Sequence, residues 1–124
     1  MSDLEPFAPI DALTAALAYD VVPAAQVVEG GPRTGLLELA TVAGAEVGIW
    51  ELTAGTARDI EVDEVFVVID GRGTVTLETD GGEQHIELSP GVVCRLTAGM
   101  TTRWVVPDRL RKVYILGAPG DAPS

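Results

Sequence analysis

The sequence predicts an all-β fold in which many short strands surround one core. Glycine (14 residues) and proline (8 residues) interrupt the chain of 124 residues at short intervals, which is typical of turns between short strands. Apolar residues make up 47% of the chain, enough for one globular core. Along most of the chain they alternate with polar residues. Strands without intervening helices predict a sandwich, a barrel or a jelly roll.

The N-terminal part carries the one helical pattern in the sequence. Ile10, Leu13 and Leu17 recur at helical spacing after Pro9, which suits the first turn of a helix. We therefore expect one short helix over residues 9–19. Beyond it the apolar period shortens toward two, and strands are expected at 24–28, 35–41, 46–53, 56–62, 64–69, 73–79, 84–88, 92–96, 101–106 and 111–116.

Turn-forming residues separate the expected strands. Asp70-Gly71 and Asp80-Gly81-Gly82 supply the positive φ angles that tight hairpins require. No linker is long enough to divide the chain into two domains. We expect a single domain over residues 1–124, with a core at about 28–117, an N-terminal segment at 1–27 and a frayed tail at 118–124.

The charge of the chain excludes several classes of partner. Nineteen acidic residues against eight basic ones leave a formal net charge of -11. This argues against nucleic acid, which needs a basic patch, and against an anionic membrane surface. The single cysteine, Cys94, cannot form an internal disulfide, and no apolar run reaches the length of a membrane span or a secretory signal. We therefore expect a cytoplasmic domain.

The strand expected at 64–69 is apolar on both faces, since Val65 to Ile69 are all hydrophobic. Such a strand is buried on both faces. The core covers one face, and either the N-terminal segment or a second subunit must cover the other. A homodimer is therefore expected.

Two stretches resemble the paired motifs of the cupin superfamily. The first motif contains an opening glycine, two histidines, a glutamate and a closing glycine. Gly55 stands at the opening glycine, and Glu64 and Gly71 keep the glutamate-to-glycine spacing. In the second motif Gly91 and Gly99 match the two glycines. The family's proline, histidine and asparagine are replaced there by Thr97, Thr102 and Val106.

A narrower resemblance covers roughly residues 28–117. The chain resembles small single-domain cupins of the ureidoglycine-aminohydrolase-like group, which includes the ethanolamine-utilisation cupin. The shared features are Trp50-Glu51, Asp63-Glu64, Arg103-Trp104 and Arg111-Lys112-Val113-Tyr114. The resemblance implies a double-stranded β-helix, the jelly-roll (RmlC-like) barrel of cupins, and leaves the specific function unknown because this fold hosts many chemistries.

The resemblance also implies a metal site, but its histidines are missing. The first-motif positions fall at Ala57 and Asp59, or at Arg58 and Ile60, and the second-motif position is Thr102; only Glu64 of the usual four ligands remains. First-row ions prefer imidazole, so we expect no metal and no other cofactor. A hard cation held by Glu64 and Asp59 stays open as an alternative. The single histidine, His85, alternates against Ile86 and is expected on the surface.

The acidic residues admit two interpretations. Glu64 is either a general base or polar anchor inside the barrel, or a buried carboxylate paired with an arginine such as Arg58 or Arg95. The run Asp59, Glu61 and Asp63 alternates with apolar residues. We favour a solvated strand face for this run over a cation site.

Alternation places aromatic residues inside the barrel. If Thr102 faces inward as in cupins, Trp104 follows it, and Trp50 and Tyr114 join the same pocket. These rings either line a cavity for a small, partly planar metabolite or fill the barrel. The candidate catalytic residue is Glu64, and the candidate ligand contacts are Trp50, Arg58, Glu64, Thr102, Trp104 and Tyr114.

We therefore expect a metal-independent cupin that binds a small polar metabolite in its barrel, with Arg58 available to a ligand carboxylate. One alternative is an acid–base enzyme of the ureidoglycine-aminohydrolase-like type, acting on a nitrogenous or carbonyl metabolite. Another is a non-catalytic dimeric structural or regulatory protein with a filled barrel. Cys94 lacks a histidine to activate it and is expected to be a small buried hydrophobe.

Overall fold

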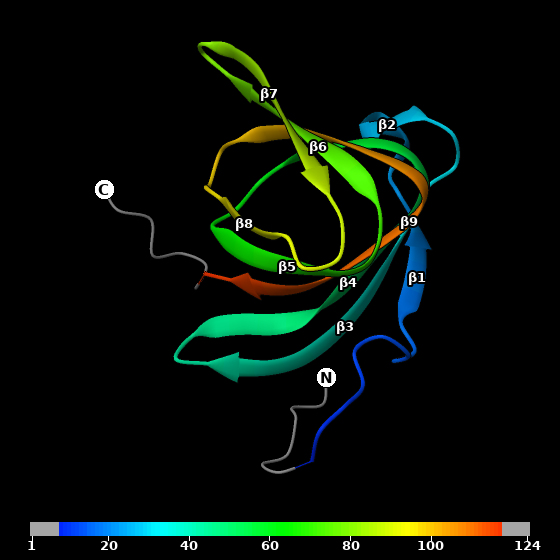
Figure 1. Cartoon of the computed structure of the whole chain (residues 1–124), viewed down its shortest axis with the longest axis vertical. Coiled ribbons are helices and arrows are strands. Elements are labelled where there is room, and N and C mark those ends of the chain that lie inside the picture. Colours follow the sequence, from blue (N-terminus) through cyan, green and yellow to red (C-terminus); the bar gives the residue numbers. More distant parts are fainter. Residues whose placement is uncertain (1–7, 118–124) are drawn as a thin grey trace.

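Nine strands dominate the computed structural model, which describes residues 8–117 (Figure 1). All their pairings are antiparallel. The strands are β1 (Ala18–Val21), β2 (Val27–Glu29), β3 (Arg33–Val42), β4 (Ala45–Ile60), β5 (Glu64–Gly71), β6 (Gly73–Thr79), β7 (Gly82–Leu88), β8 (Val93–Leu96) and β9 (Thr101–Leu116). A short 3-10 helix, η1, lies at Ala24–Gln26. The predicted all-β class is confirmed, whereas the tail expected at 118–124 lies outside the described residues.

Strands β4 and β9, each of 16 residues, form the spine of the molecule. They pair along almost their whole length, from Glu46 opposite Leu116 to Ile60 opposite Thr101. The first part of β9 also pairs with β6, and its last part pairs with β5. The sheet therefore divides on either side of the shared pair and curves around the core (Figure 1).

The sequence predicts two short strands in place of β4, and two in place of β9. The pairing of β4 with β9 shifts register between Thr53 and Gly55, opposite Pro107 and Asp108. Such a bulge bends a strand without ending it. Gly55 and Pro107 therefore mark a bend in a continuous pair of strands rather than a loop.

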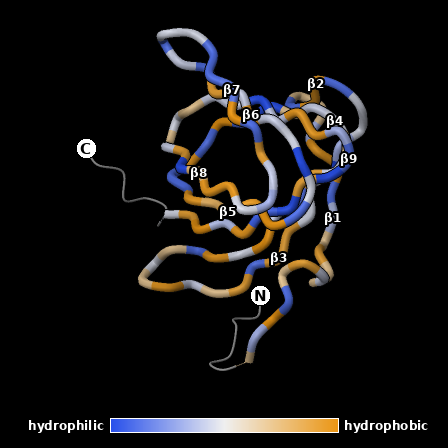
Figure 2. Tube along the Cα trace, in the orientation of Figure 1, coloured by the Kyte–Doolittle hydropathy of each residue, from blue (hydrophilic) through white to orange (hydrophobic). Residues whose placement is uncertain are grey.

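The core fills the space between the two halves of the sheet. Phe66 and Val68 on β5, Leu52 on β4 and Leu110 on β9 are almost completely buried. These side chains alternate with outward-facing neighbours, and apolar and polar residues intermingle along the barrel wall (Figure 2). At the hairpin glycine Gly71, φ is +82°, and a Cβ there would collide with the carbonyl oxygen of Arg109.

The helix predicted over 9–19 is not formed, and the segment makes a single turn before β1. Asp11 accepts a hydrogen bond from the amide of Leu13 through Oδ1 (2.9 Å) and one from the amide of Ala15 through its carbonyl (3.0 Å). The helix does not continue because the guanidinium of Arg111 takes up carbonyls of this segment, and residues 18–21 pair with β3. Tertiary contacts here override a weak helical pattern. Within residues 8–117 no helix has the length and apolarity needed to cross a membrane.

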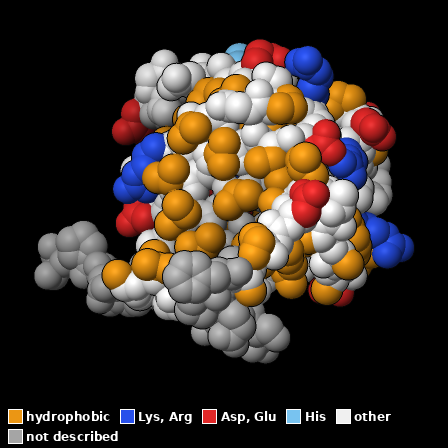
Figure 3. Space-filling view, turned by 60° about the horizontal axis from the view of Figure 1, so that its bottom comes forward, with side chains coloured by type: hydrophobic (Ala, Val, Ile, Leu, Met, Phe, Trp, Pro, Cys, Tyr) orange, Lys and Arg blue, Asp and Glu red, His pale blue; other side chains and the backbone are white. Residues whose placement is uncertain are grey.

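Part of the outer surface of the sheet is apolar. Val65 on β5 is 37% exposed, and Ile115 beside it on β9 is 45% exposed; Val93 on β8 is 66% exposed. We call these three residues the outer apolar patch. In the part of the N-terminal segment that the structure describes, the carbonyls of Ala12 and Ala15 contact Arg111. Figure 3 shows a face of the molecule on which apolar side chains predominate.

Candidate functional site

The barrel contains a cavity of about 340 Å³. Its wall is largely apolar and aromatic, with Trp50, Trp104 and Tyr114 among the lining residues. It also carries more acidic than basic residues: the acids are Glu46, Asp59, Glu61 and Glu64, and the bases are Arg58 and Lys112. A mostly apolar cavity with a few convergent polar groups is the usual form of a small-molecule site.

A cross-strand motif builds one wall of this cavity. Trp50-Glu51 on β4 lies directly opposite Arg111-Lys112 on β9, with Trp50 paired to Lys112 and Glu51 to Arg111. Because side chains alternate along a strand, Trp50 and Lys112 share the inner face, whereas Glu51 and Arg111 share the outer face. Two adjacent residue pairs therefore place a cation–π contact on the inner side of the sheet and an acid–base contact on the outer side.

On the inner face, the ammonium of Lys112 lies in a cage of aromatic rings. Nζ lies 4.4 Å from the ring centroid of Trp50, 4.2 Å from that of Phe66 and 4.6 Å from that of Trp104. The same atom lies 2.7 Å from Oε2 of Glu64, and both side chains are 5% exposed. We call these five residues the lysine cage. Cation–π attraction and the ion pair with Glu64 together offset the cost of burying the ammonium.

Glu61 presents a second buried carboxylate to the cavity. Its Oε2 accepts a hydrogen bond from Oγ1 of Thr102 at 2.7 Å, and Thr102 accepts one from Nε1 of Trp104 at 3.0 Å. Burial raises the pKa of Glu61, and the hydrogen bond from Thr102 offsets part of the rise. A carboxyl group fixed in position with a raised pKa is suited to exchanging a proton with a ligand.

Tyr114 lies further along the same face of β9. Its hydroxyl donates a hydrogen bond to Oε2 of Glu46 at 2.8 Å, and burial raises the pKa of Tyr114 well above its ordinary value. Gly48 lies directly opposite on β4, where a Cβ would collide with the Tyr114 hydroxyl. The phenol is therefore held in its neutral form against the strand.

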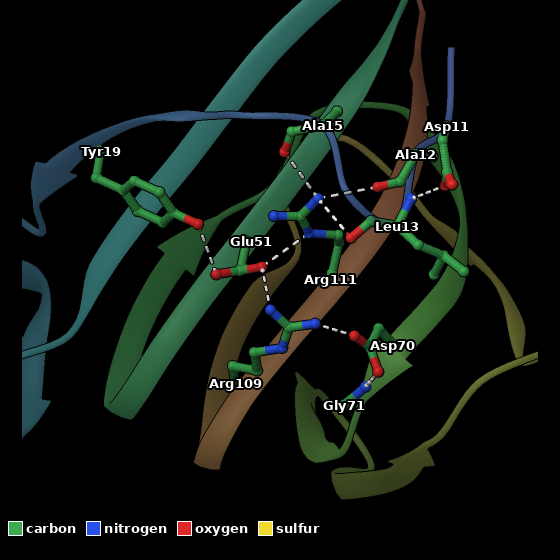
Figure 4. Close-up of polar contacts among 10 residues, drawn as sticks. All are labelled: Asp11, Ala12, Leu13, Ala15, Tyr19, Glu51, Asp70, Gly71, Arg109 and Arg111. Carbon is green, nitrogen blue, oxygen red and sulfur yellow. Dashed lines mark hydrogen bonds and ion pairs between the residues drawn. The ribbon is translucent and has the colours of Figure 1, made fainter. Parts of the chain in front are cut away.

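On the outer face, Glu51 is the centre of a polar network (Figure 4). It accepts hydrogen bonds from Nε of Arg111 and from the hydroxyl of Tyr19, each at 2.8 Å. Arg109 lies 3.6 Å from Glu51 and also pairs with Asp70. Nη1 of Arg111 donates to the carbonyls of Ala12 (2.9 Å), Leu13 (3.3 Å) and Ala15 (3.1 Å). This outer network ties the N-terminal segment to the sheet.

The predicted site residues occupy different places. Trp50, Glu64, Trp104 and Tyr114 line the cavity. Thr102 is completely buried and positions Glu61 rather than lining the wall. Arg58 is exposed and lies opposite Arg103 on β9, and it lines the cavity beside Asp59 near the end of β4.

Two interpretations of the acidic residues need correction. Glu64 pairs with Lys112, not with Arg58 or Arg95; Arg95 instead contacts Asp63. Glu61 is not on a solvated strand face, because β4 ends at Ile60 and the chain turns inward there. The amide of Glu61 donates a hydrogen bond to the carbonyl of Met100 at 2.8 Å, and this bond fixes the turn.

Sequence reasoning missed Lys112, Glu61 and Glu46 as cavity residues. The signal for Lys112 was present, since alternation from Tyr114 places it inward and it is the chain's single lysine. Nothing in the local pattern distinguishes Glu61 from its acidic neighbours. The predictions for two other residues are confirmed: His85 is exposed, and Cys94 is buried, with burial raising the pKa of its thiol.

The donor set does not fit the metal site that the resemblance implies. The positions of the family's histidines hold residues without imidazole, and the carboxylate of Glu64 is occupied by the Lys112 ammonium. Among residues 8–117 no group of three or more His, Cys, Asp or Glu side chains is arranged to hold an ion. A hard cation on Glu64 and Asp59 would also face the positive charge of Lys112.

The comparison with protein families agrees with the fold. Residues 40–114 match the model of the EutQ-like cupin domain. The chain belongs to the EutQ-like cupin family. The predicted resemblance to ethanolamine-utilisation cupins is therefore confirmed, and the matched residues include both the Trp50-Glu51 and the Arg111-Lys112 halves of the cross-strand motif.

Solved structures of cupins share this fold at low sequence identity. The EutQ protein of Clostridium difficile is 18% identical, with a TM-score of 0.60 over 86% of this chain and 98% of that chain. A protein of unknown function from Pseudomonas syringae is 20% identical, with a TM-score of 0.70 over 86% of this chain and 46% of that one. Vicilin GC72-A of Gossypium hirsutum is 36% identical over 55 residues, which are 44% of this chain but 9% of that protein. The chain thus spans a small part of that curated relative.

Proposed function

We propose that this cupin binds a small polar metabolite in its barrel, and that binding needs no transition-metal ion. The cavity of about 340 Å³ carries this proposal, because it reaches a desolvated carboxylate, Glu61, beside two tryptophans. The tryptophans supply apolar surface for a ligand. Glu61 supplies an acceptor that a ligand donor can satisfy.

The charge of the cavity wall favours a particular kind of ligand. Lys112 neutralises Glu64, and the hydroxyl of Tyr114 donates to Glu46. Among the remaining charges of the wall, the carboxylates of Asp59 and Glu61 outnumber the guanidinium of Arg58, which favours a ligand with a positive charge or an N–H donor. A small amine fits this wall better than a small carboxylate, so the carboxylate-binding role expected for Arg58 has less support.

A melting-temperature screen tests this proposal. The panel contains small amines, each with the alcohol of the same carbon skeleton, and is applied to the wild type, Glu61→Gln and Glu29→Gln. Glu29 is exposed on β2 and serves as the matched control. A ligand at a hundredfold its Kd stabilises the protein by about 2.7 kcal/mol. An amine should stabilise the wild type and the control, and stabilise Glu61→Gln less. Equal shifts from amines and alcohols, or no shift from any compound, would contradict the proposal.

Acid–base catalysis is the second candidate function, and Glu61 supports it better than Glu64 does. Its raised pKa and its hydrogen bond from Thr102 suit a group that exchanges a proton with a bound ligand. Glu64 is already paired with an ammonium. For a compound that the screen identifies, turnover followed by NMR should disappear in Glu61→Gln even at saturating concentration. Turnover that survives this substitution would exclude Glu61 as the acid or base. The non-catalytic alternative with a filled barrel has less support than either, because the cavity is open.

We also propose that a second copy of the chain covers the outer apolar patch. Val65 and Ile115 are directly paired neighbours on β5 and β9, and Val93 adds to their exposed apolar surface. Two chains of net charge -11 repel each other, so association requires an apolar contact surface. Light scattering at micromolar concentration should give a dimer, and Val65→Lys should give a monomer. A wild-type monomer under these conditions would contradict this proposal.

A further inference from the structure

The inner end of the cavity holds a positive charge that the chain itself supplies. Lys112 is the only lysine among 124 residues, in a chain of strongly acidic composition. Its side chain is nevertheless buried in the barrel, at 5% exposure. A buried ammonium is costly unless it is paired. The surroundings of Nζ must therefore compensate for lost hydration.

Those surroundings have the chemistry of a site for an organic cation. The centroids of the three rings lie between 4.2 and 4.6 Å from Nζ, within the range of cation–π attraction. Glu64 adds a carboxylate at 2.7 Å. Aromatic cages of this kind bind free alkylammonium groups in other settings. We propose that Glu64, Trp50, Phe66 and Trp104 form an organic-cation site, which the chain fills with the ammonium of Lys112 in place of a metal ion.

The strand register accounts for the way in which Lys112 reaches this site. It lies directly opposite Trp50 on β4 and opposite Val68 on β5, so its side chain rises between two inward-facing neighbours. Glu64 and Phe66 share the inner face of β5 with Val68. The cation is thus held from both flanking strands, with Trp104 from β9 completing the cage.

A metal ion and this ammonium are mutually exclusive ligands for Glu64. A divalent ion at the carboxylate would face a positive charge that lies 2.7 Å from Oε2. The rings offer no lone pair for coordination. The inference rests on the metal-independent part of the proposed function and does not depend on whether the cavity binds a metabolite.

Chemical rescue tests the inference. Lys112→Ala removes three methylenes and the ammonium. The cation n-propylammonium has the same number of carbons and the same charge as the removed groups. The matched control is Arg111→Ala, which removes the neighbouring cation from the outer face. Melting temperatures are measured with n-propylammonium chloride, with 1-propanol, and with sodium chloride at equal ionic strength. Where a variant is unfolded in buffer, refolding yield after dilution from urea gives the same comparison.

The inference predicts that n-propylammonium raises the melting temperature or refolding yield of Lys112→Ala, while 1-propanol and sodium chloride do not. Arg111→Ala should show no preference for the ammonium. Equal responses of Lys112→Ala to all three additives would overturn the inference.

In parallel, the wild type is incubated with Mn²⁺, Ni²⁺ and Zn²⁺ and desalted, and the metal that it retains is measured. Failed rescue without retained metal would overturn the organic-cation site alone, whereas a stoichiometric metal in the wild type would overturn both this site and the metal-independent part of the proposed function.

Discussion

Each face of the β4–β9 pair carries a buried ion pair, and the two ion pairs have different roles. On the outer face, Glu51 and Arg111 hold the N-terminal segment through three backbone carbonyls. On the inner face, one residue away, Lys112 and Glu64 pair beneath aromatic rings at the cavity wall. The outer contact is one part of a larger polar network, whereas within residues 8–117 the Lys112 ammonium forms one ion pair, with Glu64. The outer contacts therefore anchor the N-terminal segment, whereas the inner contacts shape the wall of the cavity.

The largest expected effect comes from removing the inner cation. Lys112→Met leaves Glu64 buried without its partner, which we expect to destabilise the protein by about 3–5 kcal/mol. Chemical denaturation measures this loss. The double variant Lys112→Met/Glu64→Gln removes the unpaired charge and should recover most of the stability. If the double variant is as unstable as the single one, the charge of the cage is not the cause of the loss.

A smaller loss is expected from the outer cation, even though Arg111 makes more hydrogen bonds. In Arg111→Met, Glu51 keeps Arg109 and Tyr19 as partners, so we expect a loss of about 2–3 kcal/mol. Limited proteolysis should cut the N-terminal segment faster than in the wild type. Ligand binding in the cavity should stay unchanged. A variant with an intact protease pattern would show that the three carbonyl contacts do not hold the segment.

Much of the inner face could be predicted from alternation alone. Period two on β9 places Thr102 and Trp104 inward, and the same rule applied to 110–116 brings Lys112 and Tyr114 to the cavity. The identity of Glu64 as a buried acid also follows from the family motif. The partner of Glu64 could not be predicted, because the contact between Glu64 on β5 and Lys112 on β9 depends on the register of these two strands, which a single sequence does not reveal.

The outer face was harder to predict. The helical pattern at 9–19 is real, but Arg111, about a hundred residues away, takes up the carbonyls that a helix would use. The bend at Gly55 also looks like a loop in sequence and is a bulge in a continuous strand. The position of Glu61 could not be predicted from the sequence. The alternation of acidic and apolar residues continues past Ile60, although β4 ends there and the chain changes direction.

The inner face should also respond to pH through Glu61. Folding raises the pKa of this carboxyl above its ordinary value of 4.5, so the folded state binds the proton more tightly than the unfolded state does. Ionisation therefore costs stability above the folded pKa, and the cost disappears as pH falls toward 4.5. The stability of the wild type relative to Glu61→Gln should rise as pH is lowered from about 7.5 to 4.5.

Urea titrations of both proteins across this range measure the difference. Glu29→Gln, on the exposed strand β2, controls for general charge effects and should give no such slope. A difference between wild type and Glu61→Gln that is independent of pH, or that falls as pH is lowered, would show that burial does not shift this group.

The smallest expected effect concerns the edge of the outer network. Tyr19→Phe removes one hydrogen bond to Glu51 in a partly buried place. Because Arg111 and Arg109 remain beside Glu51, the loss in the free energy of unfolding should be about 1 kcal/mol. Combined with Arg111→Met, the two losses should not add, since both act on Glu51. Strict additivity in a double-mutant cycle would mean that the two side chains act independently.

The environment of Lys112 can be measured directly, because a chain with one lysine gives one lysine signal. NMR of protein labelled at lysine reports the ε-methylene protons and the ammonium. Three rings within 4.6 Å of Nζ should move the ε-proton resonance far upfield of its value in the unfolded chain, and the ion pair with Glu64 should slow exchange of the ammonium protons with water. An ε-proton resonance at the unfolded position, together with rapid exchange, would contradict the caged cation.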